Sequence, residues 1–157
     1  MLTYNIKRYI LYNIKGNKHN IYILREEGMR MRYNKYDVIY GEFPDRDGSI
    51  QSGYRPGIVI QNNIGNTYSP TLIAIPLTSK IKNLEQGTHM LIECSNENGL
   101  RVNSMLLAEQ IATIDKKKTK KIGQISDRSL QKEIFKCFIH LAAYGERDED
   151  LKELQIC

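Results

Sequence analysis

Short β-branched runs separated by turn residues are the feature that most constrains how this chain folds. Ile58-Val59-Ile60 and Leu72-Ile73-Ala74-Ile75 are typical of buried strands, and residues 62–70 between them are rich in Asn, Gly, Ser and Pro. A polar loop is expected over 44–53, and further strands are expected over 36–43, 89–93, 104–107 and 110–114. Many short strands at such close spacing favour a mainly β fold, a small barrel, over a βαβ sheet.

The period of the pattern becomes helical near the C-terminal end. Ser126 or Asp127 is expected to cap a helix that ends at Gly145. The inner face of this helix is predicted to carry Leu130, Ile134, Cys137, Phe138 and Leu141. Residues 146–157 hold five acidic against two basic side chains, so they are interpreted as a solvated acidic tail.

Residues 1–30 differ in composition from the rest of the chain. They hold six Lys or Arg against two Glu and show no clear hydrophobic period, which indicates a basic N-terminal extension, disordered or outside the native protein. The run Arg25-Glu26-Glu27-Gly28 before Met29 is what a purine-rich ribosome-binding sequence would encode. Our hypothesis is that residues 1–28 are largely read-through and that Met29 or Met31 is the native start, with an RNA-gripping basic arm as the alternative.

Composition narrows the class of protein. A chain of 157 residues fits one domain, predicted here over 31–145, and no run of about 18 apolar residues that would cross a membrane occurs. Three cysteines, Cys94, Cys137 and Cys157, without a Cys-x-x-Cys spacing argue against a disulfide framework or a zinc ribbon and predict a cytoplasmic protein. The net charge of +5 is compatible with a polyanionic partner.

The familiar catalytic motifs are missing. There is no phosphate-binding glycine loop, no nucleophile elbow and no zinc-protease helix motif, and the histidines His19, His89 and His140 are scattered. For His89 a structural hydrogen-bonding role is predicted, and for His140 a packing or helix-surface role. Arg55 stands out because Pro56 restricts its backbone to an extended conformation, although the local pattern by itself favours a solvated strand-end arginine.

Two stretches of the sequence, one of which contains Arg55, form a recognisable set of motifs. Residues 48–78 contain Gly-Ser-Ile-Gln-Ser-Gly-Tyr-Arg-Pro, then Gln-Asn-Asn-Ile-Gly-Asn-Thr-Tyr-Ser-Pro-Thr, then a strand ending in Thr78. Residues 103–116 contain Glu-Gln-Ile-Ala-Thr-Ile-Asp-Lys, and Thr88-His89 lies between the two stretches. Together these motifs resemble the MazF/PemK family of toxin endoribonucleases over residues 31–145.

The resemblance implies a fold, an activity and partners. The fold would be a small SH3-like barrel of the CcdB/MazF/PemK type with a C-terminal helix, acting as a homodimer. The activity would be sequence-specific cleavage of single-stranded mRNA without a metal or cofactor, and the partners would be RNA and a MazE-like cognate antitoxin with an acidic segment. Carried over residue by residue, the catalytic residues would be Arg55 and Thr78, with RNA near Ser49, Gln51 and Gln110.

The chain departs from the family pattern at several positions. Family members often have Glu where this chain has Ile50 and a loop glycine where it has Ser52, while Tyr54, Gly57 and Ala112 are further differences. These bear on the target sequence and the loop more than on the reaction.

Other interpretations remain open from the sequence. The alternatives are a gyrase-inhibiting toxin on the same barrel and a non-catalytic barrel. The gyrase-inhibiting toxin relies on a C-terminal Trp, and this chain has no Trp. Phe43 and Tyr68 are candidates for base stacking or for packing. The lysine-rich run 116–121 is interpreted as a solvated helix start, with an RNA track as the alternative.

Overall fold

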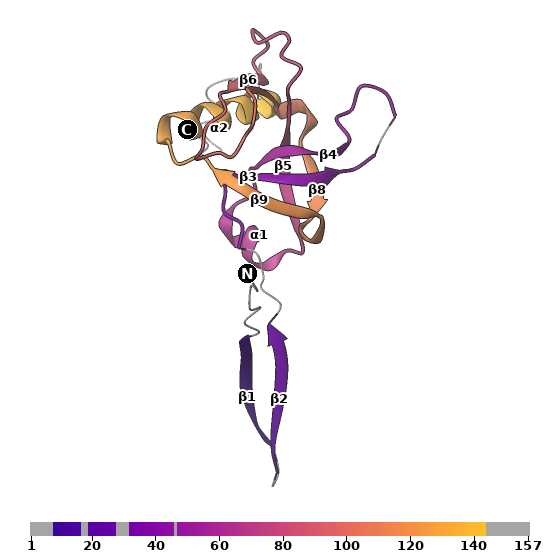
Figure 1. Cartoon of the computed structure of the whole chain (residues 1–157), viewed down its shortest axis with the longest axis vertical. Helices are drawn as coiled ribbons and strands as arrows, with labels where there is room; N and C mark the ends of the chain where they lie inside the picture. Colours follow the sequence, from indigo (N-terminus) through magenta and orange to yellow (C-terminus); the bar gives the residue numbers. More distant parts are fainter. Residues whose placement is uncertain (1–7, 17–18, 28–31, 46, 144–157) are drawn as a thin grey trace, which may run out of the picture. The chain divides into compact units, whose positions relative to one another are not determined.

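A computed structural model of the chain describes residues 8–16, 19–27, 32–45 and 47–143 (Figure 1). The chain divides into two units, Met1–Arg32 and Tyr33–Cys157. In the described part, no helix is long and apolar enough to cross a membrane.

The first unit contains a β-hairpin. β1 (Arg8–Gly16) and β2 (His19–Glu27) pair antiparallel, in a register that runs from Arg8 opposite Glu27 to Gly16 opposite His19. These strands are not predicted from the sequence, because the Tyr, Ile, Asn and Lys residues of the segment follow no alternation between two faces. The proposed start at Met29 or Met31 stays a prediction and lies outside the described residues, as does the acidic tail 146–157.

The second unit is built on an antiparallel sheet. Its strands are β3 (Asp37–Phe43), β4 (Gly53–Val59), β5 (Thr71–Thr78), β6 (His89–Ile92), β7 (Ser104–Leu107), β8 (Ala112–Asp115) and β9 (Thr119–Gln124). The order is β6-β7-β5-β4-β3-β9, and β8 also pairs with β5. β5 therefore branches the sheet, since its first half pairs with β8 and its last two residues pair with β7. The predicted mainly β class is confirmed, although the strand path does not close into a ring.

The described residues of the second unit also form two α-helices. The short α1 (Asn63–Tyr68) is capped by the Asn62 side chain, which accepts from the backbone N–H of Gly65. The longer α2 (Arg128–Ala143) begins after Asp127, whose Oδ1 accepts from the N–H of Ser129 at 2.9 Å, as predicted for a cap. The predicted end of this helix at Gly145 lies outside the described residues.

The core forms two clusters on the sheet. One is built from residues such as Val38, Ile75 and Leu106 and is covered by α2, whose Ile134 is fully buried among them. Leu130, Cys137 and Phe138 pack against the same cluster, which confirms most of the predicted helix face. Leu141 does not belong to it and is 39% exposed. The second cluster centres on Ile39, Phe43, Val59 and Leu72.

Several predicted boundaries are wrong for physical reasons. Residues 62–70 contain α1 because Asn62 provides a cap within the turn-rich segment. Residues 108–110 form a 3-10 turn, so the strand predicted from Gln110 begins only at Ala112. The run 116–121 begins as a 3-10 turn over Lys116–Lys118 and then joins β9, because pairing with β3 outweighs the local helix signal. Tyr36 stays outside β3 with φ of 70°.

Candidate functional site

A groove of about 920 Å³ lies on the second unit, over β3, β4, the end of β5 and β9. Its lining includes Gln51, Arg55 and Thr78, which are three of the five site residues predicted from the sequence. The segment 99–104 forms another part of the wall. The structure therefore brings the two predicted catalytic residues into one hollow, together with part of the polar loop before β4.

Arg55 occupies the third position of β4, opposite Gly41 of β3. Its guanidinium is held by the preceding loop: Nε donates to the backbone carbonyl of Ser52 at 2.8 Å, Nη2 donates to the same carbonyl, and Nη1 donates to Oε1 of Gln51. The side chain is half-buried, and this burial lowers its pKa, while Tyr40 acts in the opposite direction. Two of the five N–H groups, one on each Nη, are left for a ligand.

Thr78 ends β5, where it pairs with Met105 of β7. The ladder between β4 and β5 includes Gly57 opposite Pro76. Arg55 on β4 and Thr78 on β5 each lie two residues beyond this last pair, and both line the groove. The Thr78 hydroxyl accepts from the backbone N–H of Lys80 at 3.2 Å, so its own proton is available for donation to a ligand.

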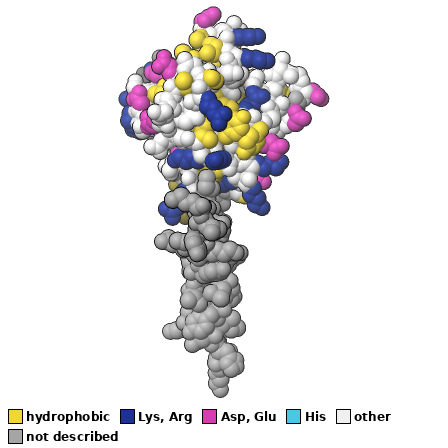
Figure 2. Space-filling view, viewed as in Figure 1, with side chains coloured by type: hydrophobic (Ala, Val, Ile, Leu, Met, Phe, Trp, Pro, Cys, Tyr) yellow, Lys and Arg dark blue, Asp and Glu magenta, His cyan; other side chains and the backbone are white. Residues whose placement is uncertain are grey.

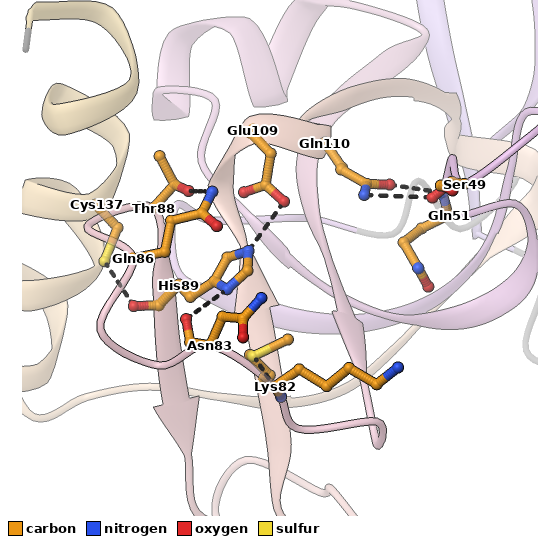
Figure 3. A network of polar contacts seen from close by, with 11 residues as sticks. Ser49, Gln51, Lys82, Asn83, Gln86, Thr88, His89, Glu109, Gln110 and Cys137 are labelled. Atoms are coloured by element: carbon orange, nitrogen blue, oxygen red, sulfur yellow. Dashed lines mark hydrogen bonds and ion pairs between the residues drawn. The ribbon is translucent and has the colours of Figure 1, made fainter.

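Gln110 holds the loop that holds Arg55 (Figure 3). Its side-chain carbonyl accepts from the backbone N–H of Gln51 at 2.6 Å, and its amide nitrogen donates to the carbonyl of Ser49 at 3.5 Å. Neither Ser49 nor Gln110 lines the groove, unlike Gln51. A chain of hydrogen bonds therefore runs from the 3-10 turn that carries Gln110, through the 49–52 loop, to the guanidinium of Arg55.

His89 anchors the same 3-10 turn from the other side (Figure 3). One ring nitrogen lies 2.9 Å from the carbonyl of Asn83 and the other lies 3.2 Å from Oε1 of Glu109, the residue before Gln110. Its backbone carbonyl accepts from the Cys137 thiol at 3.9 Å. These bonds agree with the predicted structural hydrogen-bonding role of His89. The ring of His140 lies next to Gly87, a position that agrees with the predicted packing or helix-surface role.

The electrostatics of the groove favour an anion. Four cationic side chains, Arg55, Lys80, Arg101 and Lys120, are among its described lining residues, and no Asp or Glu is among them. Figure 2 shows Lys and Arg side chains set among apolar ones on the face turned to the viewer, with Asp and Glu towards the margins of that view. An RNA track along the lysine run 116–121 was the alternative drawn from the sequence, and of that run only Lys120 lines the groove.

The aromatic residues of the groove are Tyr40 and Tyr54, not the two candidates named from the sequence. Phe43 is 1% exposed and belongs to the core, so the base-stacking alternative is wrong for it. Tyr68 is exposed on α1 but does not line the groove. The exposed position of Tyr40 between the buried Ile39 and Gly41 is the alternation of an outward-facing strand residue.

A metal centre is not formed by the described side chains, since no three His, Cys, Asp or Glu residues among them come together as ligands. Independence from metals stays a prediction.

The comparisons with known proteins agree on one family. Residues 34–137 match the family model described as PemK-like, MazF-like toxin of type II toxin-antitoxin system. The chain is 40% identical over 97 residues to endoribonuclease EndoA of Bacillus subtilis, covering 61% of this chain and 83% of that protein.

Solved structures share the fold at low sequence identity. MazF (Form-I) from Deinococcus radiodurans aligns with a TM-score of 0.60 and 17% identity, covering 71% of this chain and 96% of the other. An endoribonuclease in complex with its cognate antitoxin, from a mycobacterial species, aligns with a TM-score of 0.56 and 16% identity, covering 73% of this chain and 99% of the other.

Proposed function

Because the chain belongs to the PemK-like, MazF-like toxin family of type II toxin–antitoxin systems, we propose that it is a sequence-specific endoribonuclease that cuts single-stranded mRNA without a metal. The observation that carries the proposal is the cationic groove whose lining includes both Arg55 of β4 and Thr78 at the end of β5. The similarity to an endoribonuclease over most of that protein's length supports the same reaction.

The geometry suits attack by the ribose 2′-hydroxyl on the adjacent phosphate. The 2′-oxygen forms a bond to phosphorus and the bond from phosphorus to the 5′-oxygen breaks, leaving a 2′,3′-cyclic phosphate and a 5′-hydroxyl. The nucleophile is already held beside the phosphate, which removes much of the entropic cost of bringing two reactants together. The protein must then stabilise the negative charge that develops on the phosphoryl oxygens.

Arg55 is proposed to bind the phosphoryl oxygens and to protonate the leaving 5′-oxygen. The free N–H on each Nη provides a planar pair of donors that matches two phosphate oxygens. Burial lowers the pKa of Arg55, which moves the side chain in the direction of a proton donor. An arginine is a poor base, so the group that removes the proton from the 2′-hydroxyl is not Arg55.

Thr78, Gln51, Ser49 and Gln110 complete the proposed site. The Thr78 hydroxyl donates to a phosphoryl oxygen from a rigid, β-branched position at the end of β5. Gln51 lies in the groove beside Arg55, whereas Ser49 and Gln110 act on RNA chiefly by fixing the loop.

The partners belong to the same proposal. RNA, a homodimer and a cognate antitoxin of the MazE type, together with a cytoplasmic place of action, follow from the family resemblance. The groove itself would accept the acidic segment of such an antitoxin, because its charged lining residues are cationic.

One assay tests the reaction. Purified protein and its Arg55→Ala variant are incubated with a long RNA in EDTA, and the cut sites are mapped. Cuts at a shared short sequence by the wild type alone support the proposal, and a 2′-deoxy substitution at the cut nucleotide should abolish them. Equal cutting by both proteins, cutting that needs added metal, or inhibition of a DNA gyrase without RNA cleavage would each contradict it.

A further inference from the structure

Two tyrosines stand exposed on the wall of the groove that holds Arg55 and Thr78. Tyr40 on β3 is 38% exposed and Tyr54 on β4 is 56% exposed. Their ring centroids are 4.8 Å apart and the ring planes meet at 71°, an edge-to-face arrangement. Resting on the function proposed above, we propose that this pair is a nucleobase subsite that stacks one unpaired base beside the bond to be cut.

The sheet leaves both rings free for a ligand. The register places Tyr40 opposite Pro56 and Glu42 opposite Tyr54, so the two rings meet diagonally on the outer face. Neither ring belongs to either core cluster. In an edge-to-face pair, at least one face of each ring is uncovered by the other ring, and an open aromatic face is the surface on which an unpaired base stacks.

Charge around the pair suits a base that carries phosphates on both sides. Lys120 lies opposite Tyr40 in the pairing of β3 with β9, and Arg55 lines the same groove as the two rings. The neighbouring carboxylate, Glu42, is neutralised by Lys118, whose Nζ lies 2.6 Å from Oε2. A stacking surface flanked by cations is how proteins bind single-stranded nucleic acid without reading it by pairing.

The subsite also explains a difference between this chain and its family. The residue before the catalytic arginine is the bulky Tyr54 in this chain, and the structure places its ring against Tyr40 rather than in the core. A base stacked there would contact the aromatic faces and reach the two phenol hydroxyls. The pair therefore adds affinity for an unpaired base next to the cleaved bond, and it accepts different bases because every base has a π-face.

The test combines protein variants with RNA that lacks single bases. Tyr40→Ala, Tyr54→Ala and Tyr54→Phe are compared with the wild type on a short RNA around a mapped cut, with each base in turn replaced by an abasic site. The matched control is Tyr68→Ala, which removes a tyrosine that is 79% exposed and outside the groove. Thermal unfolding of each variant verifies the fold.

The expected result is a coupling between one base and the tyrosines. One abasic position next to the cut should raise KM of the wild type about 5- to 150-fold, the equivalent of roughly 1–3 kcal/mol for a stacked base. The same abasic site should raise the KM of Tyr54→Ala and of Tyr40→Ala much less, because these variants already lack the stacking partner. In Tyr54→Phe the abasic site should still cause most of the rise in KM that it causes in the wild type. In Tyr68→Ala it should cause the full rise.

Other outcomes would overturn the subsite. If the abasic profiles of Tyr40→Ala and Tyr54→Ala match that of the wild type, no base stacks on the pair. If both variants lose affinity for an acidic antitoxin peptide while their abasic profiles are unchanged, the surface serves a protein partner instead.

The subsite can fail separately from the reaction. Wild-type protein that cuts no RNA contradicts the proposed function; anisotropy of the same abasic series, labelled and bound to the wild type and to Tyr54→Ala, then tests stacking alone. Equal affinities for all RNAs in that measurement would contradict the subsite.

Discussion

Replacement of Arg55 by lysine separates charge from geometry at the proposed catalytic site. In the structure the guanidinium contacts the Ser52 carbonyl through Nε and Nη2 and the Gln51 side chain through Nη1, which leaves one N–H on each Nη for a phosphate. A lysine keeps the positive charge but has one ammonium group with three donors. It is unable to hold both loop acceptors and grip two phosphate oxygens at once.

The size of the effect follows from the donors that are lost. Removing one positioned donor from a site that stabilises developing negative charge costs about 3–4 kcal/mol, or roughly 10²–10³ in rate. Arg55→Lys loses the paired donors, so its kcat should fall by a factor of at least about 10². Its charge is unchanged, so the salt dependence of RNA binding should stay the same. Arg55→Ala should lose both rate and part of that salt dependence.

Single-turnover cleavage of a short RNA with saturating protein measures this step, and binding at several salt concentrations measures the charge. Arg128→Lys is the matched control, because Arg128 lies on α2 outside the groove and donates to Gln131 at 3.3 Å. An Arg55→Lys protein that cuts within about threefold of the wild-type rate would refute the reasoning, since it would show that a point charge is sufficient.

Three further predictions concern packing, charge and a thiol. A Cβ added at Gly57 would lie 2.7 Å from Cζ of Phe43, so Gly57→Ala should destabilise the fold by about 1–3 kcal/mol in a denaturant titration; unchanged stability would contradict the packing. Lys80→Gln should lower the slope of log binding constant against log salt by about 1 for RNA, and an unchanged slope would place Lys80 away from phosphate. Burial, followed by the Glu133 charge, raises the pKa of the Cys137 thiol, so site-resolved mass spectrometry should find it alkylated more slowly than the exposed Cys94 in native protein. Because folding raises this pKa, the thiol contributes stability below the ordinary pKa of 9.0, and that contribution is lost as the pH rises through the pKa of the folded protein. A wild-type protein that became more stable than Cys137→Ser over that pH range would contradict this prediction.

The elements that were predictable from the sequence are those whose signal is local. The run 72–75 is apolar and β-branched and forms the middle of β5, and the 3.6-residue spacing of Leu130, Ile134 and Cys137 appears as the inner face of α2. Asp127 caps that helix because a short acidic side chain accepts from the first turn wherever it precedes one. Arg55 and Thr78 became candidates through their motifs, since spacing alone left an ordinary strand-end arginine.

The tertiary structure decided what depends on pairing between distant segments. The lysine run that starts at residue 116 enters a strand because β3 pairs with it. The side chain of Gln110 holds a loop that lies 59 residues earlier in the sequence. The groove brings together Arg55 of β4 and Thr78 of β5, and the pairing of β3 with β4 brings Tyr40 to Tyr54. A strand residue's face and partner are properties of the sheet. The sequence could therefore name the residues proposed to be catalytic, while only the fold could assemble the surface around them.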